Sequence, residues 1–312
     1  MLLRAADHLF WMGRYLERVE NTARVLETTC EASLLPKGRR SADREWEGLL
    51  VMVGRRDDFL ARYGAPSAAK VLRFMIVDLD NPSSLLASLR AARENARSVC
   101  GAIPPEVWES INGLWLDLKE IDETGLLSEG EASFLDRVQE GTDLFRGIVH
   151  STLSRDDVYR PIDLGTFLER ADHTVRTLGA RFPGLLQNGE SVENHDAWSA
   201  ILRSVGAAAA YRRLHRDLIV PERVAELLIL REELPCSLHA CLDRINDLLS
   251  PFSRGIGPEA VRLAADLHFL LHDLRLRQKL KHTLHEYLTD FARALQRLGA
   301  EIDRGLRGEV CA

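Results

Sequence analysis

The sequence has few cysteines and no long apolar run. Its 312 residues include an odd number of cysteines without the spacing of zinc ligands, namely Cys30, Cys100, Cys236, Cys241 and Cys311. No apolar stretch approaches the roughly 20 residues that span a bilayer, and charge appears at Arg4, too early for a secretory signal. We therefore expect a reduced, cytoplasmic protein without a membrane segment.

The sequence also lacks basic clusters and the motifs of common enzyme classes. The formal net charge is −6 and the Lys and Arg residues are dispersed, which argues against nucleic-acid binding. It has no nucleophile elbow, phosphate loop, zinc motif or dinucleotide fingerprint. The spacing of residues therefore nominates no catalytic set, and we expect neither a cofactor nor a metal.

What the sequence does contain is a repeat with an offset of 152 residues. The segment 13–24, Gly-Arg-Tyr-Leu-Glu-Arg-Val-Glu-Asn-Thr-Ala-Arg, returns at 165–176 with six of twelve positions identical. Trp46 matches Trp198 at the same offset, and Pro105 matches Pro258 after a one-residue slip. A repeat that keeps its register over many segments predicts an internal duplication. We expect two halves, 1–152 and 153–312, related by a pseudo-two-fold axis and packed as one globular unit.

The hydrophobic pattern is helical in both halves. Apolar residues recur at spacings of three and four along the segment 9–26, and similar stripes cover 82–99, 106–120, 129–150, 196–216, 236–249, 258–278 and 280–305. No alternating run rich in Val, Ile and Thr predicts a strand. The pattern predicts an all-α fold, a helical bundle with about six helices per half. Asn81 is expected to be a helix N-cap, with Pro82 just inside the helix, and the two matched tryptophans to lie in the core.

The repeated segment carries a polar stripe in each copy. Its candidate residues are Glu17, Arg18, Glu20, Asn21 and Arg24 in the first half and Glu169, Arg170, Asp172, His173 and Arg176 in the second. The spacing i,i+4 predicts one acid–arginine pair within each helix, from Glu20 to Arg24 and from Asp172 to Arg176. Glycine inside a helix costs about 1 kcal/mol relative to alanine. Its presence at positions 13 and 165 therefore predicts the close approach of another backbone or of a ligand.

Three interpretations of the stripes stay open. The simplest is structural: the stripes meet across the pseudo-two-fold axis and exchange carboxylate–arginine pairs, as in an isologous dimer. A second places them along a cleft, where arginines bind carboxylate or phosphate and carboxylates act as acid or base. A third is a metal site, because Glu17-x-x-Glu20 is superficially similar to di-iron bundles, which use Glu-x-x-His on two helices. Against it, Asn21 stands where the second half has His173, and the arginines add positive charge.

Other histidines have spacings that suit metal ligands on a helix, in the pairs His268/His272 and His282/His285. The matched positions of the first half hold other residue types. A site in one half alone is an open alternative, and we interpret these histidines more simply as surface or packing residues.

The residues 3–24 resemble the opening of the bacterial alpha-E family, which is named for an all-helical fold with a repeated Glu-Arg motif. The motif stands here as Glu17-Arg18 and Glu169-Arg170. Similarity continues in Ser-Arg-Asp-Asp at 154–157, Asn-Pro-Ser-Ser at 81–84 and Ala-Arg-Glu-Asn-Ala-Arg at 92–97, so it covers essentially the whole chain. One departure is Pro161, where the family more often has an aromatic residue.

The resemblance implies a biochemical setting. Family members are typically encoded beside, or fused to, a circularly permuted ATP-grasp protein and a transglutaminase-like cysteine peptidase. This implies ATP-dependent formation of amide bonds on peptides or small metabolites, with the peptidase trimming or reversing the product. The family offers no established catalytic residues, so only the motif positions transfer.

From this resemblance we expect a non-catalytic helical partner or peptide-substrate-binding component of that system. Arg18 and Arg170 would hold carboxylates or contact the partner, while Glu17 and Glu169 orient them. The alternative is an enzyme of the same pathway, an amide ligase subunit or a hydrolase, that uses paired Glu and Arg residues between the halves. The sequence leaves the substrate, the product and the oligomeric state open.

Overall fold

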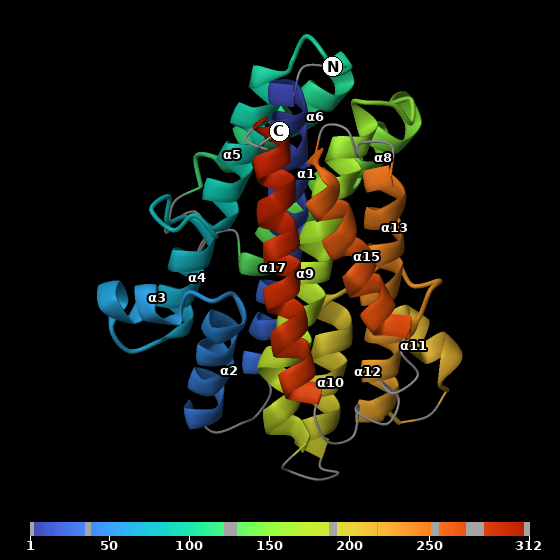
Figure 1. The fold of residues 1–312 in the computed structure, drawn as a ribbon. Helices are drawn as coiled ribbons and strands as arrows, with labels where there is room; N and C mark the ends of the chain where they lie inside the picture. The colour runs from blue at the N-terminus through green and yellow to red at the C-terminus, as the bar shows by residue number, and fades with distance from the viewer. Residues whose placement is uncertain are drawn as a thin grey trace. The chain divides into compact units, whose positions relative to one another are not determined.

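The computed structural model of the protein describes residues 3–34, 39–121, 130–186, 192–216, 218–250, 256–272 and 284–308. Within these ranges it contains fourteen helices and no strand (Figure 1), which confirms the predicted all-α class. The chain divides into two compact units, Met1–Thr166 and Phe167–Ala312, and the boundary falls inside one long helix. In the described part of the chain, none of the helices combines the length and apolar content needed to cross a bilayer.

The first unit is built around one long helix. Its helices are α1 (Leu3–Leu34), α2 (Arg39–Met52), α3 (Arg56–Tyr63), α4 (Ala68–Ile76), α5 (Leu85–Ser98), α6 (Pro105–Leu118) and α8 (Glu131–Thr152), and α9 (Tyr159–Leu186) begins in it. Helix α1 packs against α2, α5 and α8, and α6 packs against both α5 and α8. The predicted apolar stripe of α1 is buried, with Leu9, Met12 and Leu26 fully covered. Trp46 is also buried, as predicted.

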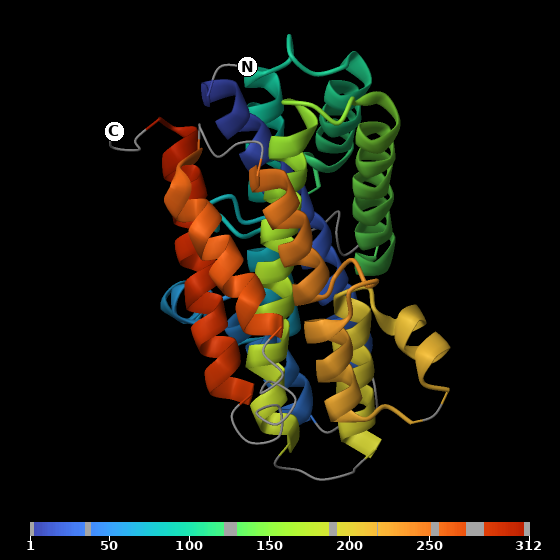
Figure 2. The same ribbon diagram turned by 45° about the vertical axis from the view of Figure 1, so that its right-hand side comes forward.

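The second unit continues α9 and adds shorter helices. These are α10 (Val192–Ser204), α11 (Ala208–Leu214), α12 (Pro221–Leu230), α13 (Leu238–Leu249), α15 (Pro258–His272) and α17 (Leu284–Leu306). Helix α15 lies beside α13 and α17, and α12 packs on α13 (Figure 2). Trp198, Leu242 and Phe291 lie in the core of this unit, which confirms the prediction for the second tryptophan.

The predicted N-cap at Asn81 is wrong. Helix α5 begins at Leu85, and its N-cap is Ser84, whose Oγ accepts a hydrogen bond from the backbone N–H of Ala87 at 3.1 Å. The Asn81 side chain is buried, and its Nδ2 donates a hydrogen bond to the backbone carbonyl of Phe74 in α4 at 2.9 Å. Asn81 therefore closes the end of α4, and three residues of turn precede the next helix.

The predicted continuous stretch 196–216 is also wrong, because it contains two helices. Helix α10 ends at Ser204 and α11 begins at Ala208. Gly206 between them has φ of 73°, in the left-handed region that glycine adopts without a steric penalty. Gly54, with φ of 67°, separates α2 from α3 in the same way. Such breaks raise the number of described helices above the expected six or so per half.

Candidate functional site

The two glutamates of the first motif lie on α1 and are buried, each with about 5% of its surface exposed. Arg24, one turn further along α1, donates from Nη2 to Oε1 of Glu20 at 2.9 Å. This confirms the predicted pair within the helix. Arg146 of α8 reaches across, forming an ion pair with Oε2 of Glu20 and placing its Nη2 3.6 Å from Oε2 of Glu17.

The carboxylates and guanidinium groups therefore form one network between α1 and α8. Arg146 also pairs with Asp143 on its own helix at 3.0 Å. A buried carboxylate is costly unless it is paired and hydrogen-bonded, and arginine meets both requirements. Desolvation offsets much of the attraction within a buried ion pair, but removing one partner leaves an uncompensated charge and is strongly destabilising.

The arginine of each Glu-Arg motif stacks on an aromatic ring of its own helix. The guanidinium carbon of Arg18 lies 5.3 Å from the centroid of the Tyr15 ring, and that of Arg170 lies 4.9 Å from the Phe167 ring. Both side chains are half-buried. The ring attracts the cation, so both motifs place their arginine over the aromatic residue three positions earlier.

The second motif repeats the acid–arginine pair. Nε of Arg176 lies 2.9 Å from Oδ2 of Asp172, which confirms the second predicted pair, and Glu169 is buried with 6% exposure. His173 does not take the place of a metal ligand beside these acids. Its Nε2 lies 3.3 Å from the backbone carbonyl of Ser204, which ties α9 to the end of α10.

Asn21, the counterpart of that histidine in the first half, is 9% exposed. Its Nδ2 has no hydrogen-bond partner among the described residues. With arginines on the neighbouring carboxylates of Glu17 and Glu20, the first motif does not resemble the carboxylate–histidine shell of a di-iron site. The acids of the first motif pair with arginines of α1 and α8, and the predicted exchange of pairs between the two stripes stays a prediction.

The two motif glycines lie where a backbone approaches, as predicted. A Cβ on Gly13 would collide with the carbonyl oxygen of Ile162, and a Cβ on Gly165 would collide with that of Phe10. All four residues belong to the first unit. The helical penalty of glycine is therefore offset by a close contact between the backbones of α1 and α9.

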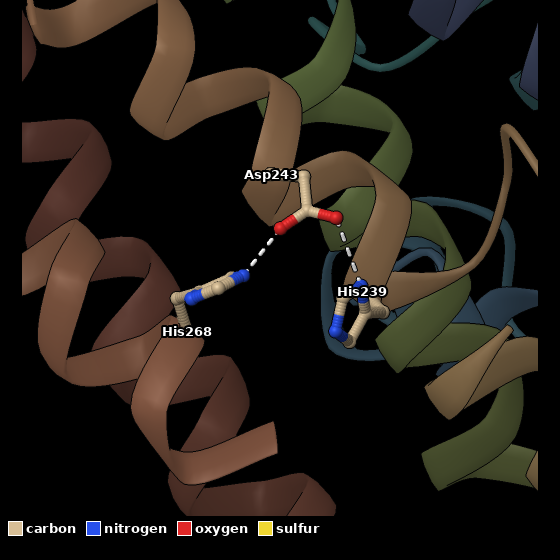
Figure 3. Close-up of side chains that lie close together, drawn as sticks. All are labelled: His239, Asp243 and His268. Atoms are coloured by element: carbon tan, nitrogen blue, oxygen red, sulfur yellow. Dashed lines mark hydrogen bonds and ion pairs between the residues drawn. The ribbon is translucent and has the colours of Figure 1, made fainter. Parts of the chain in front are cut away.

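The structure contains a second group of polar residues that the sequence pattern does not predict. His239 and Asp243 of α13 lie close to His268 of α15 (Figure 3). The sequence pattern pairs His268 with His272, whose side chain lies outside the described residues, as does all of His282. The helical spacing of His239 and Asp243 is visible in the sequence. The packing of α15 against α13, which brings the third side chain to them, is not.

Comparison with known proteins identifies the family. The model of the family Alpha-E, described as a predicted alpha-helical domain with a conserved ER motif, matches residues 1–305. Curated relatives include the uncharacterized protein Mb2597 of Mycobacterium bovis and the uncharacterized proteins MT2643 and Rv2567 of Mycobacterium tuberculosis. Each is 26% identical over 326 aligned positions, which cover 97% of this chain. The chain spans only 36% of the length of these relatives. No solved structure matches.

Proposed function

The chain belongs to the Alpha-E family, and from this premise we propose that it is a non-catalytic helical partner or substrate-binding component. The system it serves is an ATP-grasp and transglutaminase-like pair that makes or modifies peptide amide bonds, and we expect it to work in the cytoplasm, where ATP is available. The alignment supports a role within a larger assembly, because the three relatives carry this region in chains of which it is 36%.

The non-catalytic assignment rests on the burial and the arginine partners of the carboxylates in the first motif. Glu17 and Glu20 are buried and face Arg146, and Glu20 also accepts from Arg24. A general acid or base must be able to exchange a proton with a substrate within hydrogen-bond reach. Carboxylates that are already paired with arginine hold neighbouring helices in place instead. The rival function, an enzyme that uses paired Glu and Arg residues, would need these groups to be free.

We also propose that the fold is a duplicated bundle with pseudo-two-fold symmetry, as the sequence repeat predicts. Support comes from the element bounds: Ser84 and Ser237 are the N-caps of α5 and α13, and each accepts from a backbone N–H three residues on. The helix-starting prolines of α6 and α15, Pro105 and Pro258, are the same 153 positions apart. The glycine contacts are also reciprocal. Gly13 contacts Ile162, three residues before Gly165, and Gly165 contacts Phe10, three residues before Gly13. The predicted meeting of the two polar stripes stays a prediction.

In this proposal the stacked arginines contact the partner or the peptide. Arg18 and Arg170 are half-buried, and each guanidinium lies over the ring of an aromatic residue on its own helix, Tyr15 or Phe167. An oriented guanidinium suits the bidentate recognition of a carboxylate, such as a peptide C-terminus or an acidic side chain.

A binding measurement tests the proposal. The chain and an ATP-grasp protein of the kind that the family resemblance implies are purified separately and titrated by calorimetry, with and without ATP and a peptide. We expect a complex at micromolar concentrations, and amide product only when the ATP-grasp protein is present. The absence of any complex at tens of micromolar, or ATP turnover by this chain alone, would overturn the proposal.

Variants of the motif separate the two candidate functions. Replacing Arg18 and Arg170 with alanine is expected to weaken the complex while the circular dichroism spectrum is retained. Glu17→Gln combined with Glu169→Gln is expected to lower the thermal midpoint of the chain. If that double variant instead folds with unchanged stability and abolishes product, the enzyme alternative replaces our proposal. Arg262→Ala removes an exposed guanidinium on α15. It serves as the surface control for the measurements of binding, of folding and stability, and of product formation.

A further inference from the structure

A cluster of three side chains in the second unit has the composition of a metal site. His239 and Asp243 lie one turn apart on the same face of α13, and His268 projects toward them from α15 (Figure 3). We refer to these three residues as the histidine–aspartate cluster. We propose that the cluster binds a divalent transition-metal ion of the zinc class.

The ligand atoms already converge. One carboxylate oxygen of Asp243 faces each imidazole: Oδ2 lies 3.0 Å from Nδ1 of His239, and Oδ1 is in direct contact with Nε2 of His268. One ligand atom from each residue lies within 4.8 Å of those of the other two. Ligands bound to one tetrahedral zinc at about 2.0–2.1 Å are about 3.3 Å apart. The separations of the ligand atoms therefore differ from this spacing by no more than about 1.5 Å, a difference that side-chain rotation can supply.

The donor types select the class of ion. Two imidazole nitrogens and one carboxylate oxygen are ligands that zinc and its neighbours prefer, whereas calcium and magnesium are held by oxygen alone. Three protein ligands also leave a fourth position for water or a further ligand, as in zinc sites that are not purely structural.

Burial gives the cluster a covered base and an accessible edge. The His239 side chain is 6% exposed, whereas the side chains of His268 and Asp243 are 28% and 43% exposed. An ion can therefore enter from the side of the two partly exposed ligands. Oε1 of Glu232 lies 3.9 Å from Nε2 of His239, the nitrogen that does not face Asp243. At 3.9 Å the two groups are not hydrogen-bonded. A metal-bound histidine commonly donates its second N–H to a nearby carboxylate, and the exposed side chain of Glu232 can rotate toward the ring.

The packing of the two helices does not require these residues. The positions 153 residues earlier, on the equivalent helices α5 and α6 of the proposed repeat, hold Leu86, Arg90 and Trp115. The leucine is buried, the arginine exposed and the tryptophan half-buried. An equivalent helix pair is thus held together without any histidine or carboxylate at these places. The cluster is a feature of the second half alone, which points to a binding role.

Metal titration tests the proposal on the isolated chain. The protein is purified without a histidine tag, stripped with a chelator and titrated with Zn²⁺ against a chromogenic zinc indicator. We expect one equivalent to bind tightly. Changes in outer-shell partners alone cost about 10–100-fold in affinity, so His268→Ala and Asp243→Asn should each lower it by more than about 100-fold. His285→Ala, which removes an exposed histidine from α17, should leave affinity unchanged.

Two outcomes would overturn the proposal: no stoichiometric zinc binding by the unaltered chain, or equal affinity in the unaltered chain and both cluster variants. Because a variant can fail to fold, Co²⁺ is added to the unaltered chain as an independent probe. Intense visible bands of four- or five-coordinate cobalt are expected, and a weak spectrum like that of the hexaaqua ion would contradict the proposal. The titration involves no partner protein, so its result is independent of whether the proposed complex with an ATP-grasp protein forms.

Discussion

Gly13 of α1 lies against the backbone carbonyl of Ile162 at the start of α9, so closely that no side chain fits between the two helices. Gly165 of α9 stands in the same relation to Phe10 of α1. The helices touch through their backbones at both points. A contact of this kind tolerates little adjustment, because the groups that would have to move are peptide carbonyls and not the ends of flexible side chains.

We predict that Gly13→Ala and Gly165→Ala each destabilise the protein strongly. An added methyl group would force the helices apart, and overpacking of this kind typically costs about 1–3 kcal/mol, occasionally more. Urea denaturation followed by circular dichroism measures the loss in free energy of unfolding.

Gly179→Ala is the matched control on the same helix. Apart from the nearby backbone of its own helix, none of the described residues has an atom within 4 Å of the position that its Cβ would occupy. Alanine is a better helix former than glycine, so this change should stabilise the protein by about 0.4–1 kcal/mol. If all three alanine variants behave alike, the close backbone contact does not exist in solution.

The arginine that holds the first motif gives a second prediction. Arg146→Met keeps much of the side-chain volume but leaves Glu17 and Glu20 without their partner from α8. We expect a loss of about 1–3 kcal/mol, the cost of leaving a buried polar group unsatisfied. The loss should shrink when Glu20→Gln is added, because one of the two buried carboxylates that face position 146 is then neutral.

A double-mutant cycle of these two changes measures the coupling directly. The surface pair of Arg262 and Glu259 on α15 provides the comparison, because both side chains are well exposed. Its coupling should be close to zero in moderate salt. A coupling near zero at Arg146 as well would show that the network has no energetic role.

The sequence predicted the fold class because helical periodicity is a local property of the chain. The stripe of α1 and the matched tryptophans are buried as expected. The errors occurred where a local preference competes with a contact made elsewhere. Asn81 has a side chain suited to an N-cap, but its amide group donates a hydrogen bond to the backbone of Phe74. No pattern in the sequence predicts that hydrogen bond.

The candidate site was only partly predictable for a related reason. The pairs from Glu20 to Arg24 and from Asp172 to Arg176 follow from helical spacing alone. Arg146 is 126 positions from Glu20 in the chain. The choice of this arginine among many depends on how α8 packs against α1, which is a tertiary property.

The observed N-caps give a third prediction. Ser84→Ala and Ser237→Ala should each cost about 1 kcal/mol, because each removes the acceptor for one N–H of the first helical turn. Ser98→Ala near the end of α5, where the hydroxyl is exposed and donates to a carbonyl of its own helix, should change the free energy of unfolding much less. Thermal denaturation of the three variants checks the order of stability.

Cysteine reactivity gives a fourth prediction. Burial, with a further contribution from the carboxylate of Glu131, raises the pKa of the Cys30 thiol from 9.0 to about 12. The thiolate is the nucleophile, so Cys30 should resist iodoacetamide at pH 9 in the native protein. The exposed Cys100 should react. Peptide mass spectrometry after timed labelling distinguishes the two sites, and labelling in urea should remove the difference.

The same pKa shift has a consequence for stability. A thiol that holds its proton more tightly in the folded state contributes stability that is fully present below pH 9, the unfolded value, and is lost as pH rises toward about 12. The free energy of unfolding of the unaltered protein should therefore fall over this interval by more than that of Cys30→Ala. Equal slopes for the two proteins would contradict the assigned burial of the thiol.

Zinc should stabilise the folded chain if the histidine–aspartate cluster binds it. The unfolded chain does not hold His239, Asp243 and His268 together, so the ion binds mainly to the folded state. At a free zinc concentration 100 times the Kd, binding to one site adds about 2.7 kcal/mol to the free energy of unfolding. Thermal denaturation with buffered zinc should show a rise in Tm for the unaltered chain and for His285→Ala, and none for His268→Ala. A chelator should reverse the rise, because the ion acts only through mass action on the folded state. An equal rise in all three proteins would place the stabilising ion elsewhere in the molecule.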